Sequence, residues 1–327
     1  MKKVLAVCCS IVFASIMIYA SGIQRQVVGK PVVFESIYGF LPGTHLSRFS
    51  KETTASTIGY FAVDVDTYGD LGKVPARSDV AAKYKGNIEL VAVCNNSTSL
   101  AHFVLSPEYD KRDKLIADLI AASKDYDGLM IDYELIPNRD GLHFLTFLKE
   151  LKSRLPAHKS FGVCVKARVR TLANDTLPYK PIADIADKVV IMAYDEHWSG
   201  GQPGSVASME WCKRIAEYAK TQIPIDKLVM GLPFYGREWC VPDMSRAVRY
   251  ETAKTDLKEA GIHSVERDDD IPYASFSKTV DVMLWYEDCV SVVSRCRMYH
   301  DMGIKHIAFW CLGQEDTDIW NWVKVSP

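Results

Sequence analysis

The chain has 327 residues, of which 48% are hydrophobic and 24% charged, with a formal net charge of −2. A chain of this length and composition buries a large core in one main domain and is not disordered. The near-neutral charge, with no basic and aromatic-rich stretch, excludes a nucleic acid as the partner.

Residues 1–22 have the pattern of an export signal. Two lysines precede an apolar run that ends at Ala20, and the small residues after it suit cleavage by a signal peptidase. The run is at the lower limit of length for crossing a bilayer, so an uncleaved membrane anchor is the alternative. We expect 23–327 to form the folded domain and to act in the periplasm, at the cell envelope or outside the cell.

The remaining cysteines indicate neither a metal site nor a cofactor. None of them forms a CxxC pair, and their number is odd. Several lie in apolar runs, where a thiol is usually a small buried hydrophobe. We expect mostly free thiols, with at most one or two disulfides, among Cys94, Cys164, Cys212, Cys240, Cys289, Cys296 and Cys311.

Short apolar runs alternate with segments of helical period along the chain, which is typical of parallel strands joined by helices. The helical segments include 111–126, 142–155 and 209–223. Eight strands in this order predict an α/β fold, a closed (β/α)8 TIM barrel. The alternative is an open doubly wound sheet, whose usual Gly-rich phosphate turn is not found here. The predicted strands are Glu35–Phe40, Thr57–Val63, Ile88–Val93, Gly128–Tyr133, Ser160–Val165, Lys188–Ala193, Leu228–Pro233 and His306–Leu312.

One connection is longer than a helix and its loops require, because about seventy residues separate the seventh and eighth strands. The stretch of approximately 244–285 holds the helix-like ETAKTDLKEAG, then ERDDD, then the strand-like YASFS and DVMLWYE. We predict a small α+β insertion that forms a wall of a substrate groove, followed by the last barrel helix over 287–302.

The fourth predicted strand carries two carboxyls. In DGLMIDYE (127–134), Asp132 and Glu134 are two positions apart, so both point to the same side of the strand as Met130. Burial and mutual repulsion penalise two ionised neighbours, and such a pair persists where it shares a proton or serves a site that uses one. An isolated DxE is most often a solvated pair. Here it lies at the carboxyl end of a barrel strand, where barrel enzymes keep their chemistry.

Several motifs in chain order resemble glycoside hydrolase family 18, the chitinase-like barrel enzymes. DGLMIDYE resembles the family's DxxDxDxE signature, and IMAYDEH (191–197) is similar to its MxYD element. GLPFYGREW (231–239) follows the seventh strand, and FWCLGQED (309–316) ends the eighth where the family has a tryptophan. The stretch from MAYDEHWSGG onward is most similar to the bacterial spore-cortex and cell-wall N-acetylglucosaminidases of that family.

This resemblance implies a retaining glycosidase in which the substrate's own acetamido oxygen is the nucleophile. It makes Glu134 the general acid and base, and Asp132 the carboxylate that orients the acetamide. Tyr194 would donate to the acetamide oxygen, Asp195 would bind the sugar or the tyrosine network, and Trp310 would lie beneath the ring. The resemblance also implies a polysaccharide that contains N-acetylglucosamine, peptidoglycan or chitin-like, as the substrate, and we expect the protein to act as a monomer.

Each of these roles has a plain structural alternative. An inward tyrosine or tryptophan of a barrel, such as Tyr194 or Trp310, is usually part of the core, and Met192 is a core residue in either interpretation even where it borders the substrate. We assign Asp127 to organising the entrance of the strand. Membrane contact is expected only through an uncleaved anchor at 1–22.

Met130 stands where the family has its first inner aspartate. Asp132 therefore lacks a carboxylate with which to share a proton, and we predict that it stays ionised more readily. Methionine adds no hydrogen bond, so turnover is expected to be lower than in the common chitinase pattern.

Lys166 and Arg168 follow the fifth strand in VKARVRT (165–171). Charges of this kind are usually solvated surface. The alternative is that they bind the anionic lactyl or peptide carboxylates of peptidoglycan, which chitin lacks.

Two functions are consistent with these residues. The first is an exported glycosidase that cleaves β-1,4 bonds at N-acetylglucosamine in peptidoglycan or related glycans. The second is a chitinase-like protein that binds glycans with little or no turnover. The presence of Glu134 favours the enzyme, because such binders usually lack the acid.

Overall fold

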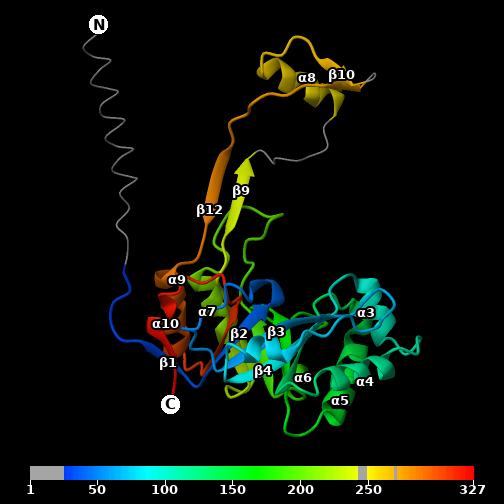
Figure 1. Cartoon of the computed structure of the whole chain (residues 1–327), viewed down its shortest axis with the longest axis vertical. Coiled ribbons are helices and arrows are strands. Elements are labelled where there is room, and N and C mark those ends of the chain that lie inside the picture. Colours follow the sequence, from blue (N-terminus) through cyan, green and yellow to red (C-terminus); the bar gives the residue numbers. More distant parts are fainter. Residues whose placement is uncertain (1–25, 242–248, 269–270) are drawn as a thin grey trace.

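The computed structural model describes residues 26–241, 249–268 and 271–327. At its centre is a closed barrel of eight parallel strands in the order β13-β2-β3-β4-β5-β6-β7-β8, with helices around it (Figure 1). This confirms the predicted (β/α)8 barrel. The expected signal or anchor, residues 1–22, lies outside the described residues.

The barrel strands nearly coincide with the eight predicted ones. They are apolar on both faces, as expected where one face fills the barrel and the other is covered by helices. Their bounds are β2 Ser36–Pro42, β3 Thr57–Asp64, β4 Asn87–Val93, β5 Gly128–Asp132, β6 Ser160–Lys166, β7 Lys188–Met192, β8 Leu228–Pro233 and β13 His306–Trp310.

Helices connect the strands and cover the outside of the barrel. Three begin at a side chain that accepts a hydrogen bond from the third residue of the helix: Ser97, Ser208 and Asp288. Two short 3-10 helices, η1 Gly43–His45 and η2 Asn138–Asp140, lie in connections. The α-helices are α2 Arg77–Ala81, α3 Thr98–Leu105, α4 Arg112–Ala122, α5 Gly141–Arg154, α6 Tyr179–Ala183, α7 Met209–Gln222, α9 Cys289–Asp301 and α10 Ile319–Trp322.

Two short strands bring the ends of the domain together. Strand β1, Val32–Phe34, pairs in parallel with β14, Val323–Val325. At the amino end of β5, Asp127 accepts hydrogen bonds from the backbone N–H of Ile88 at 2.7 Å and from Arg77 at 2.8 Å. Asp127 therefore organises the entrance of the strand, as predicted.

The two faces of β5 are divided as the alternation predicts. Met130 is buried in the cluster inside the barrel, whereas Ile131 and Tyr133 belong to the core between strands and helices. The Tyr133 ring stacks on Phe147 of α5, with centroids 5.6 Å apart. This packing holds the end of β5, between Asp132 and Glu134, against its covering helix.

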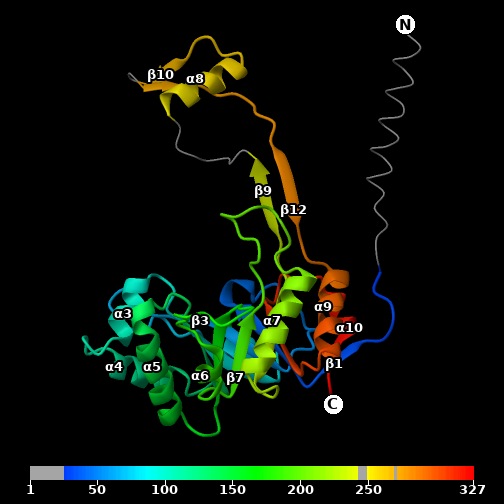
Figure 2. The same cartoon turned by 180° about the vertical axis from the view of Figure 1, so that it is seen from behind.

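A mixed excursion leaves the barrel after β8. Strand β9, Arg237–Val241, pairs in antiparallel fashion with β12, Asp281–Trp285. This ribbon extends away from the barrel and carries α8 and β10 at its far end (Figures 1 and 2). The outer elements are α8 Tyr250–Glu259, β10 Glu266–Asp268 and β11 Ile271–Tyr273.

The excursion confirms the predicted mixture of helix and strands between the last barrel strands. It begins at Arg237 rather than near residue 244, because β9 is already a partner of β12. The predicted strand over 273–277 is wrong except for Tyr273, since the β10–β11 hairpin pairs three residues on each side. None of the described helices has the length and apolar character that a membrane-spanning helix requires.

We predict that Phe147→Ala lowers the free energy of unfolding by about 3–5 kcal/mol, because it leaves a cavity beneath the Tyr133 ring. Leu142→Ala is the control: Leu142 lies on the same helix and its side chain is 77% exposed, so we expect a loss within about 0.5 kcal/mol. Equilibrium urea denaturation measures both. Equal losses for the two variants would show that the stack does not support β5.

Candidate active site

The carboxyls of Asp132 and Glu134 face one pocket of about 460 Å³ at the carboxyl ends of the barrel strands. Every side chain predicted for the site lines it, except that of Arg168. The lining residues are Phe61, Asp132, Glu134, Lys166, Ala167, Met192, Tyr194, Asp195, Trp211, Tyr235 and Trp310. The pocket is therefore built by residues from six strand ends and one helix start, which are far apart in the sequence.

Burial dominates the electrostatics of the pair. Asp132 is 5% exposed, and burial followed by the neighbouring Glu134 carboxyl raises the pKa of Asp132 to about 8, against the lowering effect of the Lys166 ammonium. Burial also raises the pKa of Glu134, again opposed by Lys166, and the Asp195 carboxylate raises it further. The pair therefore keeps a proton at neutral pH.

That Asp132 ionises more readily beside Met130 than beside a second aspartate stays a prediction. In this chain desolvation is the largest effect on the Asp132 carboxyl, and it raises the pKa. One carboxyl oxygen of Asp132, Oδ1, is buried and has no hydrogen-bond partner among the described residues. Among the described residues, no donor replaces the water that this oxygen loses.

Tyr194 lies between the carboxyl pair and strand β8. Burial raises the pKa of its hydroxyl well above the usual value, and Asp132 and Glu134 add to the shift, so the phenol keeps its proton and can donate it in a hydrogen bond. The backbone opposite its ring requires a glycine: a Cβ at Gly231 would lie 2.5 Å from the carbonyl oxygen of Ile191, and it would also lie 3.2 Å from a Tyr194 ring carbon.

Asp195 is held at the rim of the pocket in an unusual backbone conformation. Its φ is 64°, the left-handed region that few residues other than glycine adopt. The Tyr235 hydroxyl and the Arg237 guanidinium both donate hydrogen bonds to its Oδ1. Arg237 is also the first residue of β9, so the excursion is tied to the pocket at its base.

Aromatic rings form an apolar side of the pocket. Trp310, the last residue of β13, contacts Phe61 edge-on at 4.8 Å between centroids and Phe40 at 5.7 Å. Trp211 in the first turn of α7 lines the pocket as well. Rings of this kind offer flat apolar surface to the face of a sugar.

The structure separates the two cations predicted for ligand binding. Lys166, the last residue of β6, lies in the pocket. Arg168 does not line it, because its guanidinium pairs with Asp175 at 3.2 Å. A two-residue step along an extended chain keeps both side chains on one side, but β6 ends at Lys166 and the alternation stops there.

Five contributors were not singled out from the sequence: Phe61, Ala167, Trp211 and Tyr235, which line the pocket, and Arg237, which bonds to Asp195. The segment GLPFYGREW did mark the region of the last two, though not their contact with Asp195. The predicted wall from the insertion is not seen, since none of its described residues from Arg237 to Trp285 lines the pocket. All seven cysteines among the described residues are free thiols.

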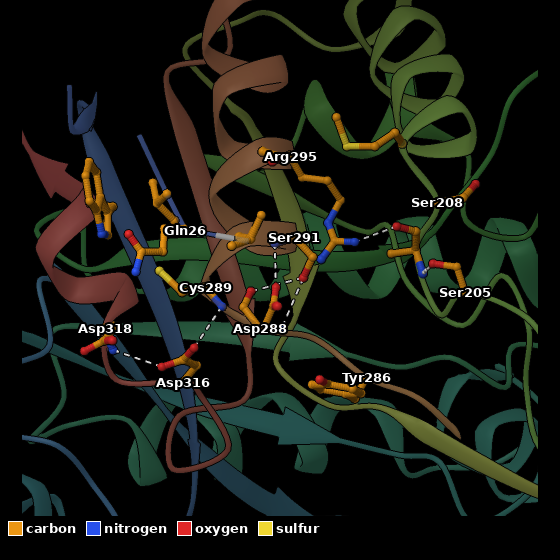
Figure 3. A pocket seen from close by; sticks show the side chains of 16 residues that line it. Gln26, Ser205, Ser208, Tyr286, Asp288, Cys289, Ser291, Arg295, Asp316 and Asp318 are labelled. Atoms are coloured by element: carbon orange, nitrogen blue, oxygen red, sulfur yellow. Dashed lines mark hydrogen bonds between the residues drawn. The ribbon is translucent and has the colours of Figure 1, made fainter. Parts of the chain in front are cut away.

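A larger cavity of about 1270 Å³ lies apart from the carboxyl pair, between the starts of α7 and α9 (Figure 3). Two of its carboxylates accept from backbone at the start of α9: Asp288 from the N–H of Ser291 at 2.8 Å, and Asp316 from that of Cys289 at 3.0 Å. None of the predicted site residues lines it. Because the buried carboxyl pair, Tyr194 and Trp310 line the smaller pocket instead, we assign the chemistry to that pocket.

Comparison with known families identifies the chain. The family model for glycosyl hydrolases family 18 matches residues 37–315. The chain belongs to glycosyl hydrolase family 18. As a family-18 member it is a glycosidase.

Relatives of the family-18 chain include bacterial sporulation and cortex enzymes. It is 26% identical to the uncharacterized glycosylase YvbX of Bacillus subtilis, over 99% of both chains. It is 23% identical to a cortical fragment-lytic enzyme of Bacillus anthracis, over 81% of this chain and 66% of that one. The crystal structure of the Bacillus cereus spore cortex-lytic enzyme SleL has the same fold, with a TM-score of 0.71, 21% identity, and coverage of 92% of this chain and 77% of that one.

The departure from the family-18 signature at Met130 is accommodated by a glycine. A Cβ at Gly162 would lie 2.7 Å from the Met130 sulfur and 2.5 Å from its terminal methyl. The thioether therefore occupies the space over β6 inside the barrel, together with Tyr38 and Cys164. An apolar side chain fills the place next to Asp132, which contributes to the desolvation of that carboxyl.

We predict that Lys166→Met moves the alkaline limb of the kcat/KM profile to higher pH. Removing the ammonium removes the charge that lowers the pKa of Asp132 and of Glu134, so the proton leaves the pair at a higher pH. Arg168→Met is the control, because that guanidinium is outside the pocket and should leave the limb near pH 8. An unmoved limb in Lys166→Met would contradict the electrostatic assignment.

Proposed function

We propose that the chain is an exported glycosidase that cleaves β-1,4 bonds at N-acetylglucosamine in peptidoglycan or related glycans, with retention and with assistance from the substrate. The observation that supports it most is the meeting of Glu134, Asp132, Tyr194 and Trp310 in one pocket. We further propose that it acts as a monomer in the periplasm, at the cell envelope or outside the cell. Its only membrane contact would be an uncleaved anchor at 1–22.

Glu134 is the general acid and then the general base. Its raised pKa keeps the carboxyl protonated closer to neutral pH than an ordinary glutamate. The glycosidic oxygen takes this proton as its bond to the anomeric carbon breaks. In the second step the carboxylate of Glu134 takes a proton from water, whose oxygen attacks the same carbon. The bond from that carbon to the acetamido oxygen breaks, which restores the neutral acetamido group.

Asp132 and Tyr194 act on the acetamido group. Its carbonyl oxygen forms a bond to the anomeric carbon as the leaving oxygen departs, which gives an oxazolinium ion with positive charge at nitrogen. Asp132 accepts from the acetamide N–H and stabilises that charge, and the Tyr194 hydroxyl donates to the oxygen. The unpartnered Oδ1 of Asp132 is an acceptor available for such an N–H.

The same pair explains how a protonated Asp132 is compatible with this role. One proton is shared between Asp132 and Glu134 while the pocket is empty. The positive charge that develops on the substrate favours the ionised Asp132 and leaves the proton on Glu134. Activity then requires one proton on the pair and is lost when that proton leaves near pH 8.

Trp310 and Lys166 bear on the choice of substrate. The indole gives the sugar ring a flat apolar floor, and the ammonium lies in the pocket beside the carboxyls. Peptidoglycan carries lactyl and peptide carboxylates, and an ammonium is a favourable partner for them. Relatives named for cortex lysis favour peptidoglycan over chitin as well. Arg168 is left out of this proposal because Asp175 occupies its guanidinium.

The second candidate is a glycan-binding protein with little or no turnover. Its supporting observation is Met130, which removes one carboxylate of the family signature. The retention of Glu134 in the pocket supports the enzyme instead.

We expect Glu134→Gln to lower kcat on reduced peptidoglycan by about 10²–10⁴-fold while binding is retained, because the amide keeps the shape and loses the proton. Release of reducing ends and mass spectrometry of the products measure turnover and the bond cleaved. Equal and negligible release by the wild-type chain and the variant would leave only the binding protein.

We expect Lys166→Ala to weaken binding of muropeptide chains by about tenfold more than binding of chitin oligomers, since only the former carry carboxylates. Calorimetric titration in the Glu134→Gln background removes turnover from the comparison. Arg168→Ala is the matched cation control and should affect neither ligand selectively. An equal loss of affinity for both glycans in Lys166→Ala would contradict the proposal that Lys166 selects peptidoglycan.

A further inference from the structure

Asn95 follows strand β4 and bonds to the backbone that carries both pocket carboxyls. Its Nδ2 donates to the carbonyl oxygen of Asp132 at 3.0 Å. Its Oδ1 accepts from the backbone N–H of Glu134 at 2.7 Å. One side-chain amide therefore spans Tyr133 and holds the backbone on both sides of it.

These two bonds continue the barrel sheet beyond its last rung. Strand β5 ends at Asp132, which pairs with Val93 of β4, and its register with β6 ends at Ile131. Glu134 lies past this point, where strand pairing no longer orders the chain. A side-chain amide has one donor and one acceptor side, as a peptide group has, so Asn95 takes the place of the missing rung.

The side chains of the pair do not provide this order themselves. Asp132 Oδ1 has no partner among the described residues, and Met130 beside it is apolar. The position of each carboxyl therefore depends on the position of the backbone of residues 132–134. A shift of about 1 Å at a reacting group can lower a rate by about a hundredfold.

We propose that Asn95 is a positioning residue for the glycosidase reaction, whose amide fixes the backbone of Asp132 and Glu134 so that both carboxyls keep their places at the substrate. This inference rests on the proposed roles of the two carboxyls. It adds a residue from the neighbouring strand that acts on the substrate through them.

The test compares Asn95→Ala with Asn96→Ala in the full chain. Asn96 is the next residue, of the same type, and its Nδ2 donates to the carbonyl of Val65 at 3.3 Å, so it controls for the loss of an ordinary loop hydrogen bond. For Asn95→Ala we expect kcat to fall about ten- to a hundredfold with KM nearly unchanged, and the pH profile of kcat to shift. Asn96→Ala should keep the kcat and the pH profile of the wild-type chain.

Hydrogen–deuterium exchange of the peptide that contains Glu134 gives a readout that does not need turnover. Its amide should exchange faster in Asn95→Ala than in Asn96→Ala, at similar midpoints of thermal unfolding. Unchanged exchange, or faster exchange with kcat and pH profile equal to those of Asn96→Ala, overturns the proposal. If the wild-type chain itself does not turn over, the proposed function fails, and exchange still decides whether Asn95 holds the strand end.

Discussion

The burial of two neighbouring carboxyls at the end of a barrel strand is the constraint on which this site depends. Asp132 and Glu134 lie where water is largely excluded, and desolvation is the largest cause of the raised pKa of each. A carboxyl pair in this position is costly to the fold unless a proton or a nearby cation reduces its charge. Here a retained proton and the Lys166 ammonium both do so.

The rest of the pocket is arranged around that pair. Gly231 lets the Tyr194 ring approach, and Asp195 is kept in a left-handed conformation by two donors from beyond β8. Backbone strain of this kind persists where the surroundings hold it, and it is concentrated at functional sites. Because Arg237 is also the first residue of β9, the same contact that holds Asp195 anchors the excursion.

The replacement of an inner carboxylate by Met130 alters how the pair is ordered rather than whether it exists. The thioether packs over Gly162 within the barrel and offers Asp132 no hydrogen bond. The end of β5 is then held by two contacts that do not use the carboxyls. The Tyr133 ring packs on Phe147 outside the barrel, and the Asn95 amide bonds to the backbone of Asp132 and Glu134. Both contacts join β5 to its neighbours in the fold, and neither involves the carboxyl groups directly.

The sequence by itself determined the barrel and the carboxyl pair. The alternation of side chains along a strand and the position of apolar runs depend only on neighbours along the chain. Local pattern therefore sufficed to predict the eight strands, the inward side of β5 and the role of Asp127 at its entrance. The motif order also placed Tyr194 and Trp310 near Asp132 and Glu134.

Only the tertiary structure decided the protonation of Asp132, the separation of Lys166 from Arg168, and the contacts of Asn95, Tyr235 and Arg237. Each depends on groups from other strands. Desolvation is a property of the whole surroundings of a carboxyl, and a hydrogen bond between β4 and β5 depends on register that no local pattern encodes.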